Sequence, residues 1–203
     1  MVTGVQGPPP SDDLIVRRLR KDDESVLEQL VALYWQPLVR FAGGIVQREG
    51  AAEDVVQEAF IRLWSRRHTL GFEGSVRAFL YTLTRNAAID EHRRLGRQGA
   101  LTTRAATPAA PASPLSHAVE SELRKAAEAA VEALPPRRRE VFRLARIEGL
   151  TYREIAQVMD LSPQTVANQM SRALTDLHRA LDPLLGHDSG EGPGPSDGVE
   201  GDS

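Results

Sequence analysis

Apolar residues recur every three or four positions along most of the chain, which is the spacing of one buried helix face. In the longest such stripe, Leu30, Leu38 and Phe41 fall on the same side. Pro37 lies within this segment and should kink or break it, because proline lacks the N–H of a helical hydrogen bond. The stripes predict helices over residues 12–20, 23–47, 51–67 and 75–95.

The second half of the chain carries clear signals for where helices start and stop. Gly149 stands where a glycine ends one helix. Thr151 precedes Glu154 by three residues, the spacing of a capping box at the start of the next helix. Ser162 and Pro163 supply an N-cap and a first-turn proline for the last helix.

Three segments lack the apolar residues that would offset the entropy cost of ordering, namely residues 1–10, 98–117 and 187–203. The middle segment is rich in Ala, Pro, Ser and Thr and separates the two periodic regions, so it is predicted to be a flexible linker. The predicted fold class is all-α, with two small helical domains over residues 11–97 and 118–186.

The composition excludes several classes of protein. The 203 residues include no cysteine, so disulfides, thiolate metal sites and cysteine catalysis are absent. The longest unbroken apolar run, residues 30–35, is far shorter than the roughly 18 residues that a membrane span needs. No signal-peptide pattern opens the chain. We expect a soluble, cytoplasmic protein that does not insert into a membrane.

Charge is spread unevenly along the chain, and this changes the meaning of the formal net charge of −3. Residues 65–104 hold 8 basic and 3 acidic side chains, a net charge of +5, whereas residues 187–203 hold 5 acidic and no basic ones. Arginine, whose planar fork suits phosphate and guanine, provides nearly all of the cations. The excess of basic residues in this segment is compatible with phosphate binding. It is equally compatible with an arginine-rich surface that contacts only solvent.

Motifs of enzymes and metal sites are missing from the sequence. No metalloprotease, P-loop or dinucleotide-binding pattern occurs, and the histidines are scattered. The carboxylates of Glu53, Asp54 and Glu58 cluster without a partner cluster elsewhere, which favours a solvated or partner-binding face. We therefore expect no catalytic residues, no metal, no cofactor and no small-molecule substrate.

Residues 151–181 have the spacing of a helix-turn-helix, in which a short capped helix and a tight turn precede a longer second helix. An ordinary corner between two helices is the alternative. The second helix turns neutral hydrogen-bonding side chains and one arginine outward near its start, where recognition helices meet base edges. A face that is only solvated more often carries Glu and Lys, so the pattern favours DNA binding.

The helix-turn-helix alone resembles both LuxR-type output domains and sigma factors, and the first domain decides between them. The runs AAEDVVQEAFIRLW (51–64) and SVRAFLYTLTRNAAIDEHRR (75–94) resemble region 2 of the extracytoplasmic-function (ECF) class of bacterial RNA polymerase sigma factors. The run from residue 134 to residue 174 resembles region 4 of the same class. The resemblance implies an initiation factor whose first domain binds the polymerase clamp and the −10 promoter element, and whose second domain binds the −35 element.

The resemblance also implies roles for individual residues. Those expected to grip the coiled coil of the largest polymerase subunit are Asp54, Gln57, Glu58, Ile61 and Trp64. Those expected at −10 DNA are Tyr81, Thr82, Arg85, Asn86, Asp90, Arg93 and Arg94. Those expected at −35 DNA are Arg153, Gln164, Thr165, Asn168, Ser171 and Arg172. Further partners implied by the family are the polymerase flap and an anti-sigma factor, with the protein joining the nucleoid inside the holoenzyme.

The −10 assignment agrees with the chemistry of melted DNA, which needs stacking surfaces, amide hydrogen bonders and cations. Tyr81 suits stacking, Asn86 suits a flipped-out base and the arginines suit phosphates. A place in the core is an equally good interpretation of Tyr81 and of Trp64.

Two other functions remain open at this point. One is a DNA-binding regulator that uses only the helix-turn-helix and acts without being a polymerase subunit. The other is a protein-interaction module that sequesters another factor.

Overall fold

The computed structural model describes residues 11–46, 48, 50–69, 75–98 and 117–184, and these ranges contain helices and turns but no strand. The elements are α1 (Asp12–Leu19), α2 (Glu24–Val46), α3 (Ala51–Ser65), η1 (Arg67–Thr69), α4 (Val76–Gln98), α5 (His117–Ala133), α6 (Pro136–Arg146), α7 (Tyr152–Met159), α8 (Pro163–Leu181) and η2 (Asp182–Leu184), where η denotes a 3₁₀ turn. The all-α prediction is confirmed. The predicted disordered ends and most of the predicted linker lie outside the described residues.

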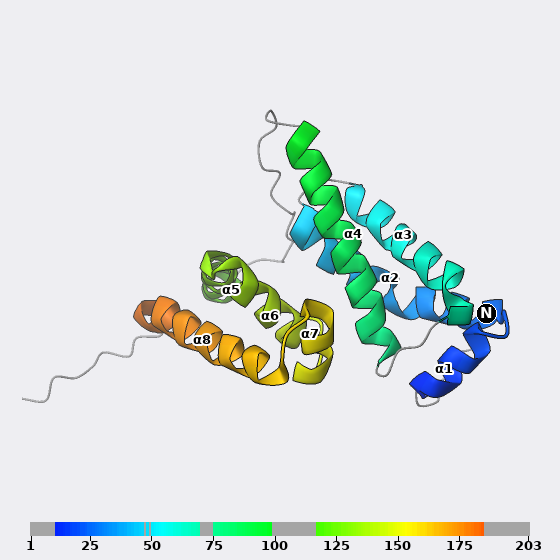
Figure 1. Ribbon diagram of the computed structural model, residues 1–203. Coiled ribbons are helices and arrows are strands. Elements are labelled where there is room, and N and C mark those ends of the chain that lie inside the picture. Colours follow the sequence, from blue (N-terminus) through cyan, green and yellow to red (C-terminus); the bar gives the residue numbers. More distant parts are fainter. Residues whose placement is uncertain (1–10, 47, 49, 70–74, 99–116, 185–203) are drawn as a thin grey trace, which may run out of the picture.

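The first domain is built from the three long helices α2, α3 and α4, which pack against one another, with the short α1 at one end (Figure 1). Leu38 of α2, Val56 of α3 and Leu80 of α4 belong to the predicted apolar stripes, and all three are completely buried. The carboxylate of Asp12 accepts a hydrogen bond from the backbone N–H of Val76, at 2.9 Å, and so ties α1 to the start of α4. Burial of these stripes is what holds the domain together.

Pro37 was predicted to kink or break its helix, and the structure excludes a break. Pro37 lies inside α2, which continues from Glu24 to Val46. Leu30 and Leu38, on either side of the proline, are both buried in the core. Packing of the same face before and after Pro37 therefore outweighs the loss of one backbone hydrogen bond.

In the second domain, the helix caps and helix ends predicted from the sequence are confirmed. The Thr151 hydroxyl accepts a hydrogen bond from the Glu154 N–H, and the Glu154 carboxylate accepts one from the Thr151 N–H, which completes the capping box. The Ser162 hydroxyl caps α8 by accepting from the Thr165 N–H at 3.1 Å. Gly149 has φ +65°, a left-handed conformation that favours glycine and that turns the chain from α6 into α7.

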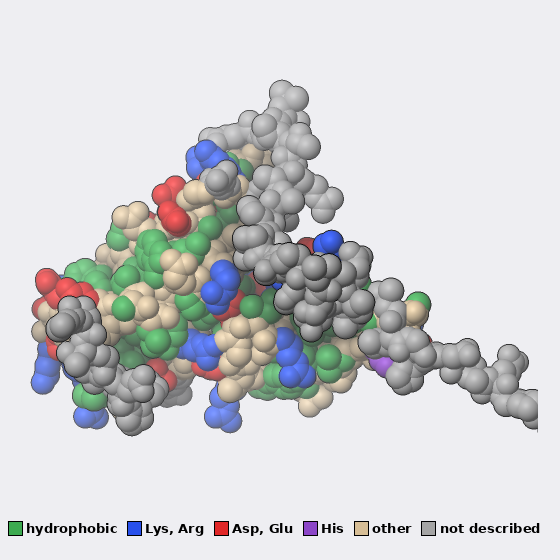
Figure 2. Space-filling model, turned by 180° about the vertical axis from the view of Figure 1, so that it is seen from behind, with side chains coloured by type: hydrophobic (Ala, Val, Ile, Leu, Met, Phe, Trp, Pro, Cys, Tyr) green, Lys and Arg blue, Asp and Glu red, His purple; other side chains and the backbone are tan. Residues whose placement is uncertain are grey.

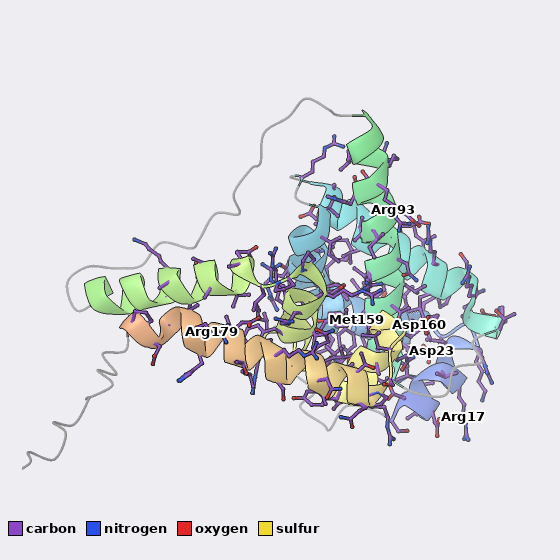
Figure 3. All side chains as sticks on the ribbon, turned by 60° about the vertical axis from the view of Figure 1, so that its left-hand side comes forward. Arg17, Asp23, Arg93, Met159, Asp160 and Arg179 are labelled. Atoms are coloured by element: carbon purple, nitrogen blue, oxygen red, sulfur yellow. The ribbon has the colours of Figure 1, made fainter. Side chains whose placement is uncertain are left out.

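The two domains touch, because α7 lies against α4 (Figures 1 and 3). Buried residues of both domains, such as Leu80 and Ile155, belong to one continuous apolar cluster. A smaller cluster formed by Ala130, Leu134 and Leu177 holds α5 to α8. In the residues that the structure describes, no helix has the length and the apolar character that crossing a bilayer requires.

Candidate nucleic-acid interface

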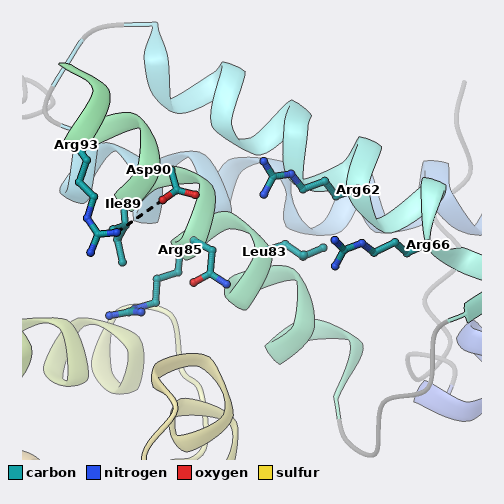
Figure 4. Close-up of a pocket in the computed structure, with 8 residues that line it drawn as sticks. Arg62, Arg66, Leu83, Arg85, Ile89, Asp90 and Arg93 are labelled. Atoms are coloured by element: carbon teal, nitrogen blue, oxygen red, sulfur yellow. Dashed lines mark ion pairs between the residues drawn. The ribbon is translucent and has the colours of Figure 1, made fainter. Parts of the chain in front are cut away.

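An open hollow of about 500 Å³ lies between α3 and α4 on the surface of the first domain (Figure 4). It is lined by Arg62, Arg66, Leu83, Arg85, Asn86, Ile89, Asp90 and Arg93. Four arginines, one amide and one carboxylate in a polar hollow form a surface that attracts phosphate and offers hydrogen bonds to a base. Four of these residues, Arg85, Asn86, Asp90 and Arg93, are predicted −10 contacts, and the structure brings all four together.

Four predicted −10 residues, from the middle of α4 toward its C-terminal end, are exposed. Asn86, Asp90, Arg93 and Arg94 all face solvent. Arg93 and Asp90 lie 3.9 Å apart, one helical turn from each other (Figure 4). Arg94 makes a two-point pair with Glu91, at 2.6 and 2.7 Å, and does not line the hollow. Arg93 and Asp90 are both exposed, as is Arg94, and ion pairs at a protein surface contribute little to stability.

Thr82 is half-buried, and its hydroxyl donates to the Ala78 carbonyl oxygen of its own helix at 2.8 Å. The hydroxyl is therefore satisfied locally in this structure, and Thr82 does not line the hollow.

Two arginines of the hollow, Arg62 and Arg66, are absent from the sequence-based assignment. Arg62 lies in α3, the helix assigned to polymerase binding, and Arg66 is the residue directly after it (Figure 4). Arg62 is paired with Glu58 of its own helix at 2.8 Å. The sequence does indicate that Arg62 and Arg66 belong together, because a spacing of four residues places both guanidinium groups on one helix face.

Two other predicted −10 residues, Tyr81 and Arg85, meet the second domain. The Tyr81 side chain is 1% exposed, and its hydroxyl donates a 2.7 Å hydrogen bond to the Glu148 carboxylate. Burial, reinforced by this bond to a carboxylate, raises the pKa of the Tyr81 phenol above its usual value of 10.0. Arg85 donates to both oxygens of Glu140. In this arrangement the Tyr81 ring is not available for stacking on a base.

The outward face of α8 is accessible to solvent. Gln164, Asn168, Ser171 and Arg172 are exposed, and so is Arg153 on α7. The two amide side chains lie one helical turn apart, and the Gln164 amide donates a 3.2 Å hydrogen bond to the Asn168 side-chain oxygen. This hydrogen bond fixes the orientation of both amides. Thr165 is half-buried, and its hydroxyl lies 2.8 Å from that of Ser162, within the helix cap.

Residues assigned to polymerase binding occupy the surface of α3. Asp54, Gln57 and Glu58 are exposed, and Ile61 is 52% exposed despite being apolar. Gln57, Ile61 and Trp64 line an apolar groove of about 290 Å³ together with side chains of α2. Figure 2 shows hydrophobic side chains reaching the surface of the molecule as seen from behind.

Trp64 is half-buried against α2, and the Arg67 guanidinium lies 4.2 Å from the centre of its ring. The indole is therefore partly a core residue and partly a wall of the groove. In the part of the chain that the structure describes, no group of His, Asp and Glu side chains could hold a metal ion.

Comparison with known proteins agrees with this division into two helical domains. Residues 30–98 match the model of Sigma-70 region 2, and residues 124–177 match that of Sigma-70, region 4, which together make up more than half of the chain.

Among relatives, the ECF RNA polymerase sigma-E factor of Escherichia coli K12 is 26% identical over 185 residues, covering 86% of this chain and 96% of that protein. The probable RNA polymerase sigma factor RfaY of Xanthomonas campestris is 30% identical over 158 residues, which cover 75% of this chain but only 40% of RfaY.

Solved structures share the fold. The structure of CnrH in complex with the cytosolic domain of CnrY matches with a TM-score of 0.63 and 24% identity, covering 86% of this chain and 99% of that one. The sigma factor RpoE of Bartonella quintana, in complex with the anti-sigma factor NepR, matches with a TM-score of 0.60 and 22% identity, covering 76% of this chain and 96% of that one. With regions 2 and 4 in the same order and relatives matched along most of the chain, this protein belongs to the ECF class of the sigma-70 family, whose members are transcription initiation factors and not enzymes.

Proposed function

We propose that this chain binds core RNA polymerase and directs it to promoters by contacting the −10 and −35 elements with separate domains. The observation that carries the proposal is the presence of two different DNA-compatible surfaces. One is the arginine-lined hollow between α3 and α4, and the other is the exposed face of α8, with its hydrogen-bonding side chains and Arg172.

The hollow suits a single strand of melted −10 DNA. Asn86 is exposed in the hollow and offers both donor and acceptor atoms to the edge of a flipped-out base. Arg62, Arg66 and Arg93 surround it with positive charge for the phosphates on either side. Asp90 keeps the hollow from being purely cationic and adds an acceptor for an exocyclic amine.

The face of α8 suits duplex −35 DNA. A helix with amides at Gln164 and Asn168 and a guanidinium at Arg172 presents the groups that read adenine and guanine in the major groove. These residues lie in the first half of the helix, the part of a recognition helix that enters the groove. Arg153 on α7 is exposed and suits the flanking phosphate backbone.

The exposed face of α3 suits the clamp coiled coil of the largest polymerase subunit. Asp54 and Glu58 are exposed carboxylates on the same helix as Ile61 and Trp64, which line the apolar groove. An apolar groove with a charged rim has the composition of a specific protein interface. The second domain would contact the polymerase flap.

An anti-sigma factor is a further proposed partner. The RpoE structure that shares this fold contains the anti-sigma factor NepR, and a partner of that kind would block the polymerase and DNA surfaces. The protein would then act in the cytoplasm and join the nucleoid when it is part of the holoenzyme, with no cofactor.

Run-off transcription tests the proposal. Purified core polymerase with this chain should start transcription at promoters, found by genome-wide mapping of start sites, that core polymerase alone ignores. An Asp54→Ala/Glu58→Ala variant should lose most of this activity. Duplex DNA binding without any binding to core polymerase, unaffected by that variant, would instead identify a regulator that acts without being a polymerase subunit.

A further inference from the structure

Trp64, which forms a wall of the apolar groove between α2 and α3, is contacted by a cation that does not line the groove itself. α3 ends at Ser65, and the 3₁₀ turn η1 that follows brings Arg67 back over the end of the helix. The Arg67 guanidinium lies 4.2 Å from the centre of the indole ring, and its Nη1 donates a 2.8 Å hydrogen bond to the Trp64 carbonyl oxygen. Arg67 is therefore attached to Trp64 through both the backbone and the face of the ring.

Asp22, in the turn between α1 and α2, is the acidic partner of Arg67. Its carboxylate accepts a hydrogen bond from Nε of Arg67, which lies 45 positions further along the chain. The same carboxylate is 3.2 Å from Nε2 of His68. The Arg67 side chain is only 20% exposed, so this pair is partly shielded from water. Because the guanidinium group is a rigid plane, engaging both Nε and Nη1 fixes the direction in which it faces.

The backbone around Asp22 presents its carboxylate in a fixed position. Asp22 has φ 60°, a left-handed conformation that aspartate and asparagine tolerate better than most residues with a side chain. Its N–H donates to the carbonyl oxygen of Leu19, which is completely buried. The next residue, Asp23 (Figure 3), accepts hydrogen bonds from the Arg18 side chain at 2.9 Å and from the Ser25 N–H at 3.1 Å. The turn is thus held on both sides of Asp22.

We infer that Asp22 and Arg67 are positioning residues for the core-polymerase site, in which Asp22 holds the Arg67 guanidinium over Trp64 and Arg67 fixes the indole as a wall of the groove. The inference rests on the proposed function, because it adds two residues to the polymerase site. An aromatic side chain that is already ordered in the free protein loses less conformational entropy on binding, which strengthens the complex. Neither Asp22 nor Arg67 lines the groove, so both act through Trp64.

Acrylamide quenching of Trp64 fluorescence gives the first test, in the free chain. The chain has two tryptophans, so Trp35→Phe leaves Trp64 as the only indole, and the phenylalanine keeps a ring against Phe60, on which Trp35 stacks. In this background Asp22→Asn and Arg67→Gln should raise the quenching constant about 1.5- to 2-fold, because the ring loses its cover. Asparagine has the shape of aspartate and tolerates the left-handed backbone, so Asp22→Asn removes the charge alone.

Asp160→Asn is the matched control for Asp22→Asn. Asp160, directly after α7, is the other non-glycine residue with positive φ, at 53°, in the part of the chain that the structure describes. It is exposed, and none of the ion pairs among the described residues involves it. The control therefore removes one negative charge from the same backbone conformation, and it should leave the quenching constant unchanged.

Affinity for core polymerase, measured by surface plasmon resonance with Trp35 in place, gives the second test. Asp22→Asn should weaken binding roughly 3-fold and Arg67→Gln roughly 5-fold, whereas Asp160→Asn should have no effect. Adding Asp22→Asn to Arg67→Gln should cause no further loss, because Asp22 acts through Arg67. Circular dichroism fixes a temperature at which every variant is fully folded, and binding is compared there.

Three outcomes would overturn the inference. The first is an unchanged quenching constant in Asp22→Asn, and the second is an unchanged affinity of Arg67→Gln for core polymerase. The third is a loss on adding Asp22→Asn to Arg67→Gln that equals its loss in the parent. A lower midpoint of thermal unfolding with quenching and affinity unchanged would show that the pair only stabilises the turn. Failure of the proposed function is a separate result, namely no binding of the parent chain to core polymerase.

Discussion

The guanidinium of Arg85 holds both carboxylate oxygens of Glu140, at 2.7 and 3.2 Å, and so joins α4 to α6 across the boundary between the domains. The two residues are 55 positions apart in the sequence. A two-point pair of this kind is specific in geometry as well as in charge. Arg85 consequently has two possible partners, the second domain and DNA.

Exchanging the charges of Arg85 and Glu140 should show how much this pair contributes to the contact between the domains. Glu140→Arg places two cations together and should open the domains, whereas adding Arg85→Glu restores an opposite pair and should close them again. For a pair that is largely shielded, a coupling of about 1 kcal/mol is expected, or about a fivefold change in the ratio of closed to open chain. The chain has no cysteine, so the distance between spin labels at Gln29→Cys on α2 and Ala180→Cys on α8, both exposed positions, measures this ratio. No closure in the double variant would contradict the role of the pair.

Ile61 is expected to be an anchor for core polymerase. Its apolar side chain is 52% exposed at the groove between α2 and α3, where it gains burial only from a partner. Ile61→Asp should weaken binding to core polymerase at least 10-fold, because it places an unpaired charge in an apolar interface.

Leu14→Asp provides the control for Ile61→Asp, since Leu14 is 47% exposed on α1 and does not line the groove. Both variants should keep the helical circular dichroism of the parent. Affinity for core polymerase is measured by surface plasmon resonance, and equal losses in the two variants would argue against the groove.

The capping box of α7 should make stability depend on pH. Burial alone would raise the pKa of Glu154, but hydrogen bonds from Thr151 and Ser75 outweigh it and lower the pKa below its usual value of 4.5. A carboxyl group with a lowered pKa in the folded chain stabilises it above pH 4.5, and this contribution is lost as the pH falls through the lower value. Thr151→Ala should cost about 1 kcal/mol of the free energy of unfolding at pH 7.

The comparison of Glu154→Gln with the parent isolates the charge of Glu154. The variant should be less stable than the parent at pH 7, and the difference should shrink as the pH falls below 4.5 and through the lowered pKa of Glu154, where the parent carboxyl group becomes protonated as well. Denaturant unfolding at a series of pH values measures this, with Glu28→Gln, at an exposed position on α2, as control. A difference in stability that does not shrink anywhere below pH 4.5 would show that the charge of Glu154 has no part in it.

Features set by neighbouring residues were predictable from the sequence. The capping box of Thr151 and Glu154 and the N-cap at Ser162 are local patterns, and the structure has both. The exposed face of α8 follows from the apolar stripe on its opposite side, because a helix of known period fixes both faces at once. The helical fold class rests on the same kind of local signal.

Features set by tertiary contacts were not predictable in this way. The partners Tyr81 and Glu148 are 67 positions apart, and no periodic pattern connects them. Pro37 remains inside a helix because buried residues on both sides of it pack in one core. Arg62 and Arg66 join the hollow only because α3 and α4 pack side by side.

Asn168 is expected to read a base of the −35 element. It is exposed on α8, and its side-chain oxygen accepts from the Gln164 amide, which orients it before DNA arrives. Asn168→Ala should lower run-off transcription about 10-fold at promoters that need a −35 element, because a two-point contact with a base is worth about 1–3 kcal/mol. Arg179→Ala is the control, since Arg179 is exposed near the other end of the same helix (Figure 3). Equal effects of the two substitutions would mean that α8 supplies only general charge, and an altered preference for one base pair in Asn168→Ala would identify the position that Asn168 reads.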